Sequence, residues 1–149
     1  MANFEFSEHL DESPAEVFDF MTNIDHASAI RPAIRAARLL ESGPQGRVKR
    51  FEVKRQQGGH EVASEVSVLH GERPFRYTLA TEREGLKLVY DYHLEPDNGG
   101  TKITLKGEVQ GEKTRQALAW LVARTLESQD ADLLRALKLA MARENEPGA

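Results

Sequence analysis

The sequence contains no cysteine and no long hydrophobic run. The absence of cysteine excludes disulfide bonds, thiol catalysis and zinc sites with cysteine ligands. A membrane-spanning helix needs about 20 consecutive apolar residues, so we expect no integral membrane segment. The first ten residues, MANFEFSEHL, lack the basic and apolar regions of a signal peptide, which favours a cytoplasmic protein.

A strong charge of one sign is also missing. The net charge of −4 argues against nucleic acid as a partner. The most basic stretch, GRVKRFEVKR at 46–55, alternates its charges with Val and Phe, as the solvated face of a strand does. No H-x-H or H-E-x-x-H pattern, G-x-S-x-G elbow or glycine-rich phosphate loop is present, so we expect no metal and no cofactor.

The residues that are present change their hydrophobic period along the chain. Residues 3–10 alternate as a strand does, and Ser13 with Pro14 begins a short helix that a second one follows at 25–33. From 34 to 110 the period is two, which predicts six strands separated by short, mostly Gly-containing turns, and therefore antiparallel hairpins. The predicted strands are 34–42, 46–56, 60–70, 74–82, 86–95 and 101–110.

Residues 117–143 contain neither Pro nor Gly and are predicted to form one helix of about 28 residues. Gln129 falls near the middle of its expected apolar face, where an amide is unusual. The expected face consists of Leu118, Leu121, Val122, Leu126, Leu133, Leu137 and Ala140. The order of elements predicts an α+β helix-grip fold: a curved antiparallel seven-stranded sheet wrapped around a long C-terminal helix, with two short helices after the first strand. We expect a single domain, residues 1–149, with a frayed tail at 145–149.

Four stretches carry a resemblance to a known family. They are FEFSEHLDESPAEVFDFMTNIDHASAIRP, EVASEVSVLHGERPFRYTLA, YHLEPDNGGTKIT and the closing helix. Together they resemble the START-like (SRPBCC) superfamily, in particular its polyketide cyclase/dehydrase and lipid-transport family. Many relatives carry Trp before the Arg-Pro pair, where this chain has Ile30. The resemblance implies a deep cavity between sheet and helix that binds small hydrophobic molecules, but it does not imply one chemistry.

Strand alternation indicates which side chains face such a cavity. A mostly apolar wall with a few polar atoms is typical of a small-molecule site. A buried amide without a partner costs about 1–3 kcal/mol, so Gln129 needs a protein, water or ligand partner. In a packed core that partner is a tyrosine hydroxyl, and this alternative stays open. The predicted ligand-binding residues are Phe51, Ser64, Tyr77, Tyr90, Tyr92, Thr125 and Gln129.

Three functions remain open at this stage. The first is binding of a small hydrophobic molecule, lipid-like or aromatic. The second is a cyclase- or dehydratase-like enzyme that uses the same cavity, with Glu8 or His60 as weak candidates for the proton-transferring group. The third is a packed interaction module without a usable cavity. Arg31 is expected either at an anionic ligand head group or in a surface salt bridge, and an exposed Trp120 suggests a homodimer.

Overall fold

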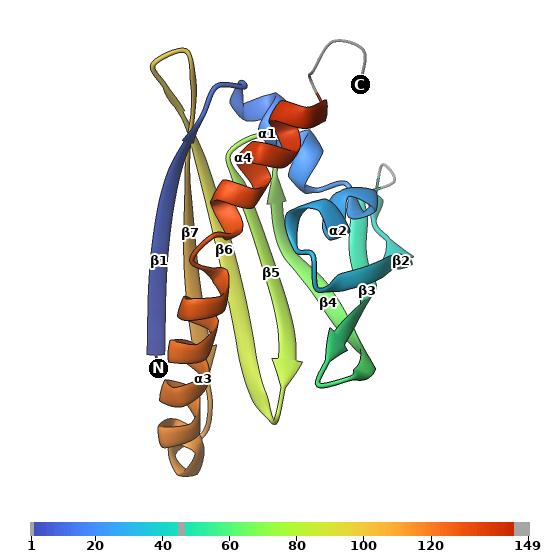
Figure 1. Ribbon diagram of the computed structural model, residues 1–149, viewed down its shortest axis with the longest axis vertical. Helices are drawn as coiled ribbons and strands as arrows, with labels where there is room; N and C mark the ends of the chain where they lie inside the picture. Colours follow the sequence, from blue (N-terminus) through green and yellow to red (C-terminus); the bar gives the residue numbers. More distant parts are fainter. Residues whose placement is uncertain (1, 45–46, 145–149) are drawn as a thin grey trace.

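A seven-stranded antiparallel sheet curves around one side of a C-terminal pair of helices (Figure 1). The computed structural model describes residues 2–44 and 47–144, so the predicted tail at 145–149 lies outside the described residues. The strands are β1 (Ala2–Leu10), β2 (Ile34–Ser42), β3 (Val48–Gln57), β4 (His60–Glu72), β5 (Arg76–Arg83), β6 (Leu86–Asp97) and β7 (Gly100–Gln110). The helices are α1 (Pro14–Met21), η1 (Ile24–His26), α2 (Ala27–Ile30), η3 (Lys113–Arg115), α3 (Gln116–Asp130) and α4 (Leu133–Glu144).

The strand order is β1-β7-β6-β5-β4-β3-β2, and every neighbouring pair is antiparallel. Strands β2 to β7 therefore form a meander of consecutive hairpins, and β1 pairs with β7 as the edge strand next to it. The hydrophobic alternation sets the register, because a shift of one residue would turn the apolar side chains to solvent. Tyr90 and Tyr92 on β6 lie opposite Leu79 and Tyr77 on β5. The predicted helix-grip fold is confirmed.

The short helices after β1 also follow the sequence pattern. Ser13 caps α1, because its hydroxyl oxygen accepts a hydrogen bond from the backbone N–H of Glu16 at 3.3 Å. Pro14 occupies the first helical position, where its missing N–H costs nothing. Val17 and Phe18 are buried against the sheet. The second short helix consists of η1 followed by the single turn α2, which ends before Pro32.

The prediction of one continuous helix from 117 to 143 is wrong. The chain forms two helices, α3 and α4, with a break at residues 131–132 that is visible in Figure 1. The predicted apolar face is also wrong in its first half. Leu121 is exposed, and the buried positions of α3 are Ala119, Ala123, Leu126 and Asp130. The second half agrees with prediction, since Leu133, Leu137 and Ala140 are buried.

The reason for the shifted face is the closeness of α3 to the sheet. This helix packs on β1 and β7 (Figure 1), and alanine side chains let a helix approach a strand more closely than leucine does. Leu118 and Val122 are only partly buried, at the side of the contact. Trp120 is exposed, as expected, and the homodimer stays a prediction.

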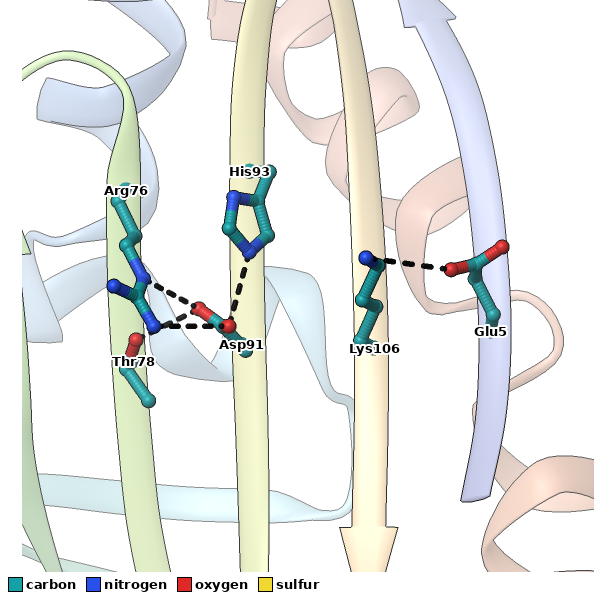
Figure 2. A network of polar contacts seen from close by, with 6 residues as sticks. All are labelled: Glu5, Arg76, Thr78, Asp91, His93 and Lys106. Carbon is teal, nitrogen blue, oxygen red and sulfur yellow. Dashed lines mark hydrogen bonds and ion pairs between the residues drawn. The ribbon is translucent and has the colours of Figure 1, made fainter.

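The outer face of β5, β6 and β7 carries charged side chains, among them Arg76, Asp91 and Lys106. Figure 2 shows Asp91 on β6 beside Arg76 and Thr78 on β5, with His93 further along β6 and the helices behind the strands. Asp91 accepts hydrogen bonds from Arg76 Nε at 3.2 Å and Thr78 Oγ1 at 2.7 Å. Cross-strand pairs of opposite charge stabilise a sheet modestly, and here they also show that this face is the solvated one.

Candidate functional site

A cavity of about 700 Å³ lies between the inner face of the sheet and the helices α2, α3 and α4. Its wall is mostly apolar, because β3 to β6 turn their alternate hydrophobic residues inward. Side chains from the end of α1, from α2 and from both sides of the α3–α4 break complete it. The lining includes Met21, Ile24, Ala27, Ile30, Phe51, Val53, Val66, Leu79, Leu88, Leu126, Leu133 and Ala136.

Six of the predicted ligand-binding residues line this cavity. They are Phe51, Ser64, Tyr77, Tyr90, Tyr92 and Gln129. The five strand residues occupy the alternate positions of β3, β4, β5 and β6 that face inward, as the alternation predicted. Gln129 is exposed, so its amide is hydrated at the edge of the cavity and needs no tyrosine partner. The role of these residues in binding stays a prediction.

Three other predicted residues do not reach the cavity. Thr125 is exposed on α3, and its hydroxyl donates a hydrogen bond to the carbonyl of Leu121 at 3.0 Å. Glu8, on the edge strand β1, pairs instead with Lys138 on α4, at 3.6 Å between Oε1 and Nζ. His60 is exposed at the first position of β4. Thr125 misses the cavity because α3 turns a different face to the sheet than predicted. Glu8 misses it because it lies on an edge strand, and His60 because it lies at the start of a strand.

The polar group that α3 turns inward is Asp130, which the sequence reasoning missed. Only 2% of its surface is exposed. Its Oδ1 accepts a hydrogen bond from Arg31 Nη1 at 2.6 Å, and its Oδ2 accepts a short one from the Tyr90 hydroxyl. The guanidinium of Arg31 lies over the Tyr90 ring, 5.1 Å from its centroid. Arg31 therefore does not form the predicted surface salt bridge: it pairs with a buried carboxylate on the cavity wall, and a contact with an anionic ligand head group stays a prediction.

Burial fixes the charge states of the phenols in and around this cluster. Burial raises the pKa of Tyr90, although Arg31 acts in the opposite direction, and the hydrogen bond to Asp130 raises it further. Burial also raises the pKa of Tyr77 and of Tyr92. Burial alone would lower the pKa of Arg31, but the nearby phenols and Asp130 outweigh it and raise that pKa. At neutral pH the cavity wall thus presents three protonated phenols and a fixed ion pair.

Two more arginines line the cavity and were not predicted as site residues. Arg55 extends from β3, and its Nη2 donates to Ser64 Oγ at 3.3 Å. Arg83 lies at the last position of β5, and its Nε is buried without a hydrogen-bond partner in the described chain. The sequence could have indicated both residues through strand alternation. Arg55 lies on the same side of its strand as Phe51 and Val53. Arg83 lies on the same side of its strand as Tyr77 and Leu79.

Within residues 2–44 and 47–144, no group of three or more His, Cys, Asp or Glu side chains is arranged to hold a metal ion. No helix in these ranges has the length and apolar character to cross a bilayer.

Comparisons with known proteins agree with this architecture. Residues 1–141 match the model of the family described as polyketide cyclase / dehydrase and lipid transport, and the chain belongs to that family. No curated protein matches the sequence at a significant level.

Solved structures share the fold at low sequence identity. A START superfamily protein from Mycobacterium smegmatis superposes with a TM-score of 0.76 at 11% identity, over 97% of this chain and 100% of that one. The di-domain ARO/CYC BexL from the BE-7585A biosynthetic pathway gives a TM-score of 0.81 at 16% identity, over 99% of this chain and 48% of that one. This chain therefore spans about half of the di-domain protein. Ara h 8.0201 gives 0.74 at 18% identity, over 94% and 97% of the two chains.

Proposed function

We propose that this protein binds a small, predominantly hydrophobic molecule in the cavity between the sheet and the helices α2, α3 and α4. The observation that carries the proposal is the cavity itself. Its volume of about 700 Å³ falls within the range of about 300–1,000 Å³ that small-molecule sites occupy. Family membership supports the same conclusion, since the family's description includes lipid transport.

The apolar and the polar side chains of the cavity wall would contribute to binding in different ways. Apolar residues such as Phe51, Val66 and Leu133 supply affinity by removing ligand surface from water, at about 25 cal/mol per Å². Tyr77 and Tyr92 remain protonated, so their hydroxyls are available to orient a carbonyl or hydroxyl of the ligand. Polar contacts of this kind fix orientation more than they add affinity.

The test measures binding of Nile red, an uncharged hydrophobic dye, by fluorescence. Ala136 lines the cavity from α4, so Ala136→Phe places a ring in the ligand space. Ala117 is exposed on the first turn of α3, and Ala117→Phe is the matched control. We expect the dye to bind the wild type and Ala117→Phe equally and Ala136→Phe at least tenfold more weakly. Equal binding to all three proteins would contradict a site in this cavity.

Material from the expressing cells offers an independent check. Native mass spectrometry of freshly purified protein, followed by organic extraction, would detect a bound molecule directly. A discrete hydrophobic compound that is present in wild-type protein and absent from Ala136→Phe supports the proposal. The same compound on both proteins would place it elsewhere.

A second function, a cyclase- or dehydratase-like reaction, is favoured by the protonated phenols on the cavity wall. The Tyr90 hydroxyl gives its single proton to Asp130, whereas the hydroxyls of Tyr77 and Tyr92 are protonated and buried, which suits donors to a developing oxyanion rather than bases. Glu8 and His60 have no part in this version, because neither lines the cavity. If a linear poly-β-ketone is cyclised, Tyr92→Phe should abolish turnover without changing the affinity for Nile red. The packed-module alternative has no specific observation in its favour.

A further inference from the structure

The cavity wall contains two arginines that have no acidic partner. Arg55 and Arg83 are half-buried, and within residues 2–44 and 47–144 neither forms an ion pair with a carboxylate. The one hydrogen bond of the Arg55 guanidinium goes to the neutral hydroxyl of Ser64. Arg83 Nε is fully shielded from solvent and has no partner there. Each guanidinium has five N–H donors, so most of this donor capacity is unused.

Of the three arginines that line the cavity, Arg31 has an acidic partner, whereas Arg55 and Arg83 have none. Arg31 lines the same cavity, but Asp130 neutralises it through a bond of 2.6 Å. The other carboxylates at the cavity, Glu82 and Asp132, are exposed, and water screens their charges. Arg83 Nε is covered by protein, so a ligand in the cavity would meet these two arginines through their terminal nitrogens.

The two arginines both lie near strand ends at the same end of the sheet, on β3 and β5 with β4 between them. Arg55 follows Val53 at inward parity on β3, two residues before that strand ends. Arg83 has the same inward parity as Thr81 on β5. The hairpins β3–β4 and β5–β6 turn at the same end of the molecule (Figure 1). The remaining lining includes Tyr77 and, from α4, Leu133 and Ala136.

We propose that Arg55 and Arg83 bind the acidic head group of an amphipathic ligand, a carboxylate or a phosphate, whose apolar part fills the rest of the cavity. This inference rests on the ligand-binding function proposed above and specifies the chemical class of the ligand. Planar guanidinium groups match the oxygen spacing of carboxylate and phosphate, and charge-assisted bonds are about twice as strong as neutral ones.

The test compares two fluorescent probes that differ in one charge, 11-(dansylamino)undecanoic acid and its methyl ester. We expect the acid to bind the wild type at least tenfold more tightly than the ester does. Arg55→Gln and Arg83→Gln should each weaken the acid about tenfold and leave the ester unchanged. Lys54 is exposed on the opposite face of β3, next to Arg55, so Lys54→Gln removes one positive charge at a matched position and should change neither affinity.

Each outcome separates this inference from the function on which it rests. If the ester binds but the acid has no advantage, or if Arg55→Gln and Arg83→Gln weaken both probes equally, the head-group assignment is wrong while the hydrophobic site stands. If neither probe nor Nile red binds, both proposals fail. Should a variant not fold, as judged by circular dichroism, the wild type alone decides: 0.5 M NaCl must weaken the acid and not the ester.

Competition identifies the head group. Dodecanoate, dodecyl phosphate and dodecanol are each used below their aggregation limits to displace the dansyl acid from the wild type. Displacement by dodecanoate at lower concentration than by dodecyl phosphate indicates a carboxylate ligand, and the reverse order indicates a phosphate. Equal displacement by dodecanol would overturn the proposal.

Discussion

Breaking the Arg31–Asp130 ion pair should destabilise the protein by an amount that depends on which partner is removed. Asp130 is 2% exposed, whereas 31% of the Arg31 side chain is exposed to the open cavity. Removing one partner of a buried pair costs about 3–5 kcal/mol, because the remaining charge is left without compensation. Arg31→Met leaves the buried carboxylate, so we expect a loss of about 3–5 kcal/mol. Asp130→Asn leaves the partly hydrated guanidinium, so the expected loss is smaller, about 2–3 kcal/mol.

The double variant Arg31→Met with Asp130→Leu replaces both charges by apolar groups. Buried ion pairs replaced in this way are often neutral or stabilising, so we expect the double variant to be more stable than either single variant. The free energy of unfolding is measured in urea at pH 7 by circular dichroism. Arg38→Met breaks an exposed pair with Glu52, 3.5 Å long, and serves as the control, with an expected cost below about 1 kcal/mol. The reasoning is refuted if the two single variants cost no more than this control.

Two other predictions concern the sheet. Partial burial by itself would raise the pKa of Asp91, but the hydrogen bonds from Arg76 and Thr78 hold it below its ordinary value. The resulting stabilisation is present above the unfolded-state pKa of about 4 and is lost as the pH falls through the folded-state value. Asp91→Asn should therefore cost about 1 kcal/mol at pH 7 and less near pH 2, in urea titrations at both pH values. A Cβ on Gly107 would overlap the ring of the buried Phe4. Gly107→Ala should therefore lower the free energy of unfolding by about 1–3 kcal/mol. A loss below about 0.5 kcal/mol would mean that the ring moves aside.

The sheet could be predicted from the sequence because it is determined by local features of the chain. Six of the seven strands are joined by short hairpins, and the period-two alternation within them determines both register and face. The predicted strand 34–42 coincides with β2, and the other predicted strands differ from the observed ones by at most two residues at each end. The inward parity of Phe51, Ser64 and the three tyrosines follows from the same alternation.

The same rule was available for the two unpaired arginines, but charge composition obscured it. The stretch from Arg47 to Arg55 was interpreted as the solvated face of a strand. That interpretation holds for Lys49 and Lys54, which are exposed. The alternation that turns Phe51 and Val53 inward continues to Arg55, and a parity argument applied without regard to charge would have placed it at the cavity.

The C-terminal helices could not be predicted to the same accuracy, because a helical face is chosen by its partner as well as by its own residues. Two stripes one residue apart were available in α3. The first contains the larger apolar residues Leu118, Leu121 and Val122, and the second contains Ala119 and Ala123. Hydrophobicity alone favours the first. The structure uses the second, since α3 rests directly on β1 and β7, where only a small side chain fits between helix backbone and sheet.

That choice of face also answers why an amide occupies position 129. Continuing the alanine stripe by three and four residues leads to Leu126 and then to Asp130, so Gln129 is left at the exposed edge. An aspartate is tolerated on the buried stripe because the helix faces a cavity at this point, and the far wall supplies Arg31 and Tyr90 as partners. Small residues bring the first half of α3 onto the sheet, and a partnered charge marks where helix and sheet separate. A single acidic residue within an apolar helical stripe, together with an unexplained arginine elsewhere in the chain, is therefore the sequence pattern that would have indicated the polar wall of this cavity.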